Sequence, residues 1–165
     1  MPVFGRSHHA LMAAAGFVIA ALFVAVAVLT RASRRQVGWA LVGAVAAGAA
    51  NVGLDVVAHS AGWWRCPEAT TPFGPLVYYA EAGLGFGALA LLFWDFEQRF
   101  GWKTPVALAA VISIYGPVRD HWTAGAFHLI EFRPGGGIFI VDALFEWVVP
   151  LLVAISIARL ERVRR

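Results

Sequence analysis

Charged residues and cysteine are scarce in this sequence. Only 14% of its 165 residues are charged and 60% are hydrophobic, whereas soluble domains contain about 25% charged residues. The single cysteine, Cys66, excludes an intrachain disulfide and any metal or redox site built from several cysteines. A disordered chain is also excluded, because disorder requires low hydrophobicity. The composition therefore predicts an integral membrane protein.

Lysine is almost absent: Lys103 is the only one, and the other 12 basic residues are arginines. Most of them flank apolar stretches, so the net charge of +3 does not indicate nucleic-acid binding. The abundance of alanine and arginine indicates a bacterial source.

Long apolar segments dominate the rest of the chain. A membrane-spanning helix needs about 20 mostly apolar residues, and continuous apolar runs favour helices over a β-barrel. Five segments qualify, at about residues 10–29, 37–58, 76–94, 105–130 and 138–158. With short loops between them, they predict an all-α, five-span helix bundle that forms one domain over residues 1–165.

The basic residues in the loops predict the orientation of this bundle. One side holds nine Lys or Arg residues and the other three, and the basic side faces the cytoplasm. We therefore expect an outside amino terminus and a cytoplasmic carboxyl terminus in the plasma (inner) membrane of the cell. Residues 25–27 resemble a signal-peptide cleavage site, but three arginines follow this segment and one precedes it, which favours a retained span.

Ionisable residues inside the predicted spans are the main functional signal. Charged groups are costly in a bilayer, so they normally face the bundle interior and mark a site or pathway. At about 1.5 Å per residue, all of these groups fall in the outer half of the membrane. The candidate catalytic residues are Asp55, Glu81, Arg119, Asp120, His121, Asp142 and Glu146.

Helical spacing predicts that these residues converge. Asn51, Asp55 and His59 recur every fourth residue and share one helix face, and Asp142 and Glu146 are spaced in the same way. Five acids face only one permanent cation, so we expect some carboxyl groups to be protonated at neutral pH. The candidate substrate-binding residues are Asn51, His59, Tyr78, Tyr115, Trp122 and Trp147.

Other features of the site are open to more than one interpretation. The aromatic residues Trp63, Trp64, Phe73, Tyr78 and Tyr79 could cover the polar layer as a lid or anchor the chain at the interface. Pro117 and Pro150 could kink their helices or simply be tolerated. His59, His121 and His128 could bind a metal, but no metal-binding motif is present and we expect no metal site. The cofactor is unknown.

Three functions are compatible with this pattern. The first is a membrane enzyme that performs acid/base chemistry on a lipophilic, lipid-like or isoprenoid-like substrate. The second is a proton- or ion-coupled transporter subunit, although the inner half of the spans lacks polar residues. The third is an accessory subunit whose buried charges dock a partner membrane protein. The expected partners are the lipid bilayer, a lipophilic small molecule, and a second copy or another membrane protein. A purely structural role for the charges is the remaining alternative, since membrane helices do use polar contacts in packing.

Overall fold

The computed structural model is predominantly helical. It describes residues 4–65, 76–127, 130–135 and 137–163. The first four helices are α1 (Phe4–Leu29), α2 (Arg34–Ser60), α3 (Leu76–Phe100) and α4 (Lys103–Phe127). The fifth is continuous and has three parts: α5 (Gly137–Asp142), the π-helical stretch η1 (Ala143–Val148), and α6 (Val149–Val163).

The predicted segments match these helices closely. Segments 10–29, 37–58, 76–94 and 138–158 each lie inside one helix. The fourth segment was predicted to extend to about residue 130; the described part of α4 ends at Phe127, and a short strand begins at Glu131. Within the described residues, three helices are long and apolar enough to cross a membrane: Arg34–Ser60, Leu76–Phe100 and Gly137–Leu160.

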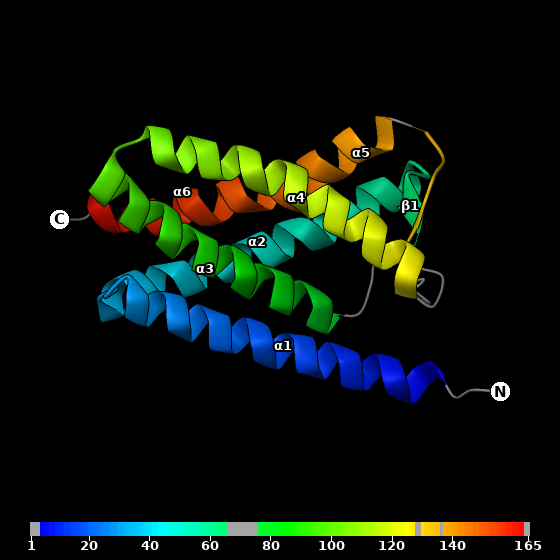
Figure 1. The fold of residues 1–165 in the computed structure, drawn as a ribbon, viewed down its shortest axis with the longest axis horizontal. Helices are drawn as coiled ribbons and strands as arrows, with labels where there is room; N and C mark the ends of the chain where they lie inside the picture. The colour runs from blue at the N-terminus through cyan, green and yellow to red at the C-terminus, as the bar shows by residue number, and fades with distance from the viewer. Residues whose placement is uncertain (1–3, 66–75, 128–129, 136, 164–165) are drawn as a thin grey trace.

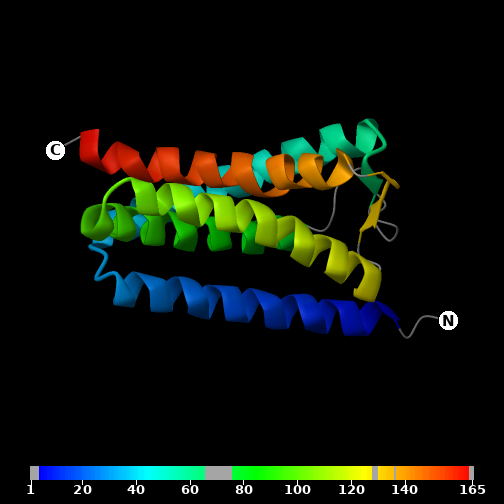
Figure 2. The same ribbon diagram turned by 45° about the horizontal axis from the view of Figure 1, so that its top comes forward.

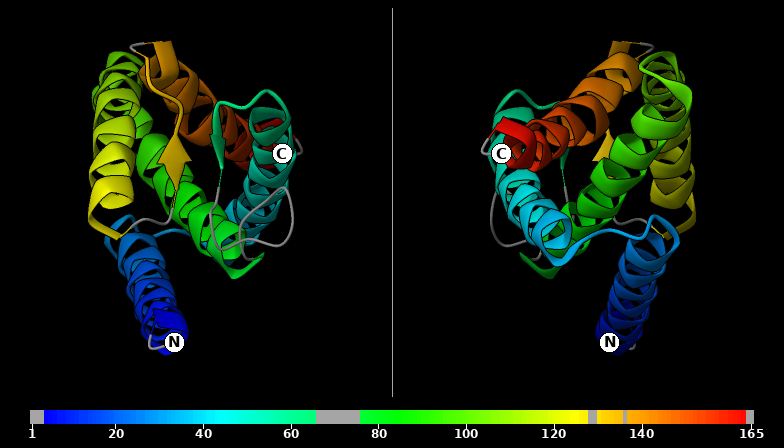
Figure 3. Two further views of the ribbon diagram at one scale, coloured as in Figure 1. Left: turned by 90° about the vertical axis from the view of Figure 1, so that its right-hand side faces the viewer. Right: turned by 90° about the vertical axis from the view of Figure 1, so that its left-hand side faces the viewer.

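The helices run along a common long axis, and the two chain ends lie at opposite ends of the molecule (Figure 1). Turning the molecule shows α1 at one edge of the bundle (Figure 2). The end-on views show the other helices grouped together, with α3 between α1 and the rest (Figure 3). Most of the described outward-facing side chains of α1 are apolar, including Phe17 and Leu22.

Small residues allow α2 and α3 to pack at backbone distance. A Cβ added at Gly48 would lie 2.7 Å from the Tyr79 carbonyl oxygen, and one at Gly83 would contact the Ala44 carbonyl oxygen. Small residues at a helix interface permit this close approach in membrane proteins. The apolar core lies on the carboxyl-terminal side of this contact along α3. It comprises Ala47, Phe86, Ala90, Phe93, Ile112, Leu151, Ala154 and Ile155.

A two-stranded antiparallel ribbon covers one end of the bundle. Strand β1 (Trp64–Arg65) pairs with β2 (Glu131–Phe132), with Trp64 opposite Phe132 and Arg65 opposite Glu131. On its outer side, the Arg65 guanidinium pairs with the Glu131 carboxylate at 2.6 Å. The loops that follow α2 and α4 are therefore joined to each other directly above the buried polar residues.

Candidate functional site

The structure brings most of the predicted polar residues together at the ribbon end of the bundle. We call this group the polar cluster. Its members are Asn51, Asp55, Tyr78, Tyr79, Arg119, Asp120, His121, Asp142, Glu146 and Trp147, with Trp64 of the ribbon closing one side.

Asp55 on α2 receives two hydrogen bonds. The indole Nε1 of Trp64 donates to Oδ1 at 2.8 Å, and the Tyr79 hydroxyl donates to Oδ2. The residue is 6% exposed. The two donors fix the orientation of the Asp55 carboxyl between the ribbon and α3.

Asp120 on α4 is also paired on both oxygens. The Arg119 guanidinium donates to Oδ1 through Nε at 2.9 Å and through a terminal nitrogen, while Trp147 Nε1 donates to Oδ2 at 2.6 Å. The guanidinium lies 4.7 Å from the centre of the Trp147 ring, a cation–π distance. Gly116 makes room for this ring, because a Cβ there would contact it.

His121 connects the ribbon with Asp142. Its Nδ1 lies 3.0 Å from the Pro117 carbonyl oxygen and 3.4 Å from Asp142 Oδ2. The imidazole stacks on the Phe132 ring of β2, with ring centres 4.1 Å apart. It also contacts the Phe139 ring of α5, and the planes of these two rings are tilted by 42° relative to each other. The two aromatic rings thus hold the imidazole in place beside Asp142.

Glu146 lies in the π-helical stretch and faces α2. Asn51 Nδ2 donates to its Oε2 at 3.3 Å. The Glu146 carboxyl also shares a hydrogen bond with the Asp55 carboxyl, and it is within electrostatic range of Asp120 and Asp142. Isolated π-helical turns are frequent at functional sites. Pro150 follows this turn, and a proline in a regular α-helix would clash with the carbonyl of residue 146. The wider π turn relieves that clash.

Four buried oxygen atoms of the cluster accept no hydrogen bond from the described residues. They are Asn51 Oδ1, Asp142 Oδ1, Asp142 Oδ2 and Glu146 Oε1. Asp142 is 0% exposed and Glu146 6%. Buried polar atoms are nearly always paired, and each exception calls for an explanation. All four are acceptor atoms, so among the described residues the cluster has more buried acceptors than donors to pair with them.

Some predicted site residues do not join this group. Glu81 faces α1, where a Cβ added at Gly16 would lie 2.5 Å from its Oε1. His59 is exposed at the end of α2, and Tyr115 and Trp122 are 61% and 67% exposed on α4. Tyr78, by contrast, lies within electrostatic range of Arg119, Asp120 and Glu146, so it belongs to the cluster.

The sequence alone did not identify Trp64 and Tyr79 as partners of Asp55, or Phe132 and Phe139 as partners of His121. Trp64 and Tyr79 were candidates for a lid, and their indole and hydroxyl groups turn inward to bind Asp55. The only available signal was the proximity of these aromatic residues to span ends. Cys66, Phe73 and His128 lie outside the described residues.

No group of three or more His, Cys, Asp or Glu side chains able to hold a metal ion occurs in the described part of the chain. Asp55 and Asp120 are occupied by hydrogen-bond donors.

No protein-family model, curated protein or solved structure matches this chain.

Proposed function

We propose that this chain is a five-span membrane protein, with its amino terminus outside and its carboxyl terminus in the cytoplasm, and that the polar cluster performs acid/base chemistry on a lipophilic substrate. Its membrane placement is supported by the three long apolar helices and by exposed apolar side chains on other helices. Examples are Phe17 on α1 and Ile114 on α4, which are 77% and 64% exposed. Large exposed apolar surfaces are rare on soluble monomers.

The observation that carries the catalytic proposal is the contrast between Asp55 and Glu146. Asp55 accepts two hydrogen bonds, from Trp64 and from Tyr79. Glu146 accepts a single 3.3 Å bond from Asn51, its carboxyl shares a hydrogen bond with Asp55, and its Oε1 receives no donor from the described residues. Because a neighbouring carboxylate and burial both disfavour a second negative charge, Glu146 holds a proton. A protonated carboxyl in an apolar site is a competent general acid.

The neighbouring groups suit the charges that such a reaction creates. Glu146 donates its proton to a double bond or a leaving oxygen of the substrate, and becomes a carboxylate. Asp55 and Asp120 stabilise the positive charge that develops on a protonated hydrocarbon. The Trp147 indole holds Asp120 in place through its Nε1 hydrogen bond.

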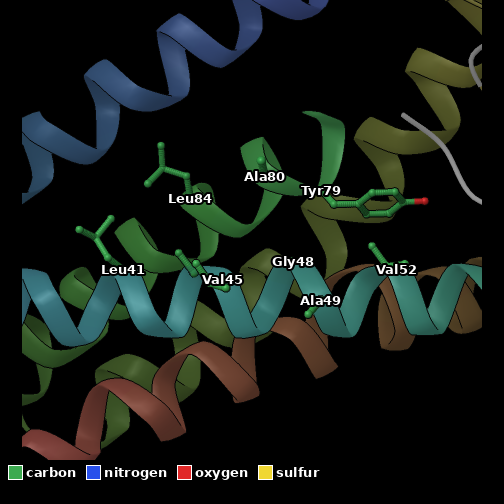
Figure 4. A pocket seen from close by; sticks show the side chains of 9 residues that line it. Leu41, Val45, Gly48, Ala49, Val52, Tyr79, Ala80 and Leu84 are labelled. Atoms are coloured by element: carbon green, nitrogen blue, oxygen red, sulfur yellow. The ribbon is translucent and has the colours of Figure 1, made fainter. Parts of the chain in front are cut away.

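A groove between α2 and α3 supports the lipophilic nature of the substrate. It has a volume of about 370 Å³ and an almost wholly apolar lining that includes Leu41, Val45 and Val52 of α2 and Ala80 and Leu84 of α3. Figure 4 shows Tyr79 at one end of the groove, with its hydroxyl directed away from the Leu41 end. That hydroxyl binds Asp55, so a hydrocarbon chain in the groove would end next to the polar cluster.

The apolar core favours an enzyme over a transporter. On α2, Ala47 lies one turn from Asn51 in the direction of the inner membrane surface, and Ile112, Leu151 and Ala154 occupy equivalent levels of other helices. A conducting path would need polar groups at these positions. The polar cluster is therefore suited to a pocket that opens on one side only.

Native mass spectrometry in mild detergent tests the proposal. The wild type, Glu146→Gln and a control, Asp95→Asn, are compared, since Asp95 is a buried acid that pairs with Arg99 outside the cluster. We expect wild type and control to retain a defined small lipophile and Glu146→Gln to lose it. A bare wild-type chain, the same lipophile in all three proteins, or a bound second protein would contradict the enzyme proposal.

A further inference from the structure

Three titratable groups, His121, Asp142 and Glu146, follow one another from the ribbon into the bundle. His121 is at the ribbon end of this series, and its side chain is 32% exposed. A carbonyl oxygen can only accept a hydrogen bond, so the 3.0 Å contact with the Pro117 carbonyl means that His121 Nδ1 carries a proton. The same nitrogen is 3.4 Å from Asp142 Oδ2.

Asp142 is the next group in the series. It is fully buried, and neither of its oxygens accepts a hydrogen bond from the described residues. Glu146 lies one helical turn further on and is within its electrostatic range. Glu146 Oε1 is likewise without a donor. The unpaired acceptor atoms thus lie along the series between His121 and Glu146, where a proton would satisfy them.

The other charged groups around this series are already paired. Asp55 is bound by Trp64 and Tyr79, and Asp120 by Arg119 and Trp147. The Asp55 carboxyl also shares a hydrogen bond with Glu146. Asp142 has both oxygens unpaired among the described residues, which suits it to pass a proton to Glu146.

We propose that His121 and Asp142 form a proton relay that supplies Glu146 from the outer aqueous side only. The inference rests on the proposed function, in which Glu146 gives up a proton in each turnover. Water delivers a proton to His121 Nε2, Nδ1 releases its proton to Asp142 Oδ2, and protonated Asp142 transfers a proton to the Glu146 carboxylate. His121 is left neutral with the proton on Nε2, and exchange with water restores the original tautomer.

The relay ends at Glu146. Beyond it, the helix continues past Pro150 into the apolar core, where Leu151 and Ala154 are buried. Protons therefore enter and leave from one side, and the relay returns a proton to the Glu146 carboxylate without carrying protons across the membrane. Phe132 and Phe139 hold the imidazole between the ribbon and α5, which makes the ribbon the positioning element for the entry group.

Infrared spectroscopy during transfer from H₂O to D₂O tests the relay directly. The band of the protonated Glu146 carboxyl is identified as the one missing from Glu146→Gln, and the rate of its isotope shift is measured. We expect Asp142→Asn and His121→Phe to slow this exchange roughly 10²-fold or more, the typical contribution of a positioned proton-transfer group. Asp142→Glu should restore much of the rate, and the Asp95→Asn control should match wild type.

The outcomes separate the relay from the proposed function. An unchanged exchange rate in both Asp142→Asn and His121→Phe would overturn the relay but leave the acid role of Glu146 intact. Absence of a protonated Glu146 band in wild type would overturn both. If wild type retains no lipophile in native mass spectrometry but proton exchange is slowed in the two variants, the proposed function is overturned and the relay stands. Two chemically different relay variants guard against a folding defect in either one.

Discussion

At the scale of single residues, the contact between α2 and α3 depends on Gly83. A Cβ at this position would contact the Ala44 carbonyl oxygen and lie 3.2 Å from the Gly48 nitrogen. Both are backbone atoms that cannot rotate away. We expect Gly83→Ala to lower the free energy of unfolding by about 1–3 kcal/mol, the usual cost of overpacking. Thermal unfolding in detergent measures this change.

Gly85 provides the matched control for this prediction. It lies on the same helix, and a Cβ there would meet no atom within 4 Å. Gly85→Ala should therefore be neutral or slightly stabilising, because alanine favours helices. Equal stability of the two variants would show that α2 and α3 do not pack at backbone distance.

The hydroxyl of Tyr79 offers a second prediction at this scale. Tyr79→Phe removes one of the two donors to Asp55 and leaves a buried carboxylate less well paired. Hydrogen bonds to charged groups contribute about 1.5–3 kcal/mol, and we expect a loss of stability in that range. Tyr115→Phe, at a position 61% exposed, is the control and should be neutral. Urea unfolding of the two variants checks the difference.

Residue spacing predicted which polar residues of α2 share a helix face. The interval between Asn51 and Asp55 placed both on one buried face, and the structure adds the bond from Asn51 to Glu146. The same rule failed for His59, which is exposed at the end of the helix. Helical periodicity specifies which residues share a face but not which helix covers that face. Glu81 illustrates the limit, since its carboxyl faces α1.

At the scale of elements, the positions of the helices could be predicted from apolar runs and their flanking polar residues. The π-helical stretch could not be predicted, because six residues are too few for their hydrophobic pattern to distinguish a π-helix from an α-helix. The ribbon could not be predicted either, since two-residue strands carry no periodicity. Its pairing joins segments 66 residues apart, and such long-range contacts leave no local signal in the sequence.

The ribbon gives a prediction at this scale. Arg65→Glu would place like charges opposite each other at the Arg65–Glu131 pair. Because exposed ion pairs contribute about 0–1 kcal/mol, we expect little change in global stability. The local effect should appear as faster exchange of the Arg133 amide hydrogen, which is bonded to the Trp63 carbonyl at 2.8 Å.

The charge swap completes this test. In the double variant Arg65→Glu, Glu131→Arg, the attraction is restored with its direction reversed, so the exchange of the Arg133 amide should return towards the wild-type rate. Protected exchange in the single variant would show that the ion pair does not hold the ribbon closed. Mass spectrometry of peptides that contain residue 133 measures these rates.

At the scale of the whole molecule, the two ends of the chain lie at opposite ends of the bundle (Figure 1). Together with the basic loops, this predicts that a reporter fused at Arg165 is cytoplasmic and one fused at the amino terminus is external. A reporter inserted at Gly101, between α3 and α4, should be cytoplasmic as well. An external signal from the Arg165 fusion would overturn the proposed orientation.

The pairing of β1 with β2 also sets an order of assembly. As the chain is synthesised, Trp64 is complete long before Phe132, so the ribbon can close only after α3 and α4 are in place. Until then the His121 imidazole has no Phe132 ring against which to stack. A nascent chain that stops after α4 would therefore carry the acids of α2 and α4 without the ribbon that covers them, and the polar cluster is complete only when the last helix, with Asp142 and Glu146, is added.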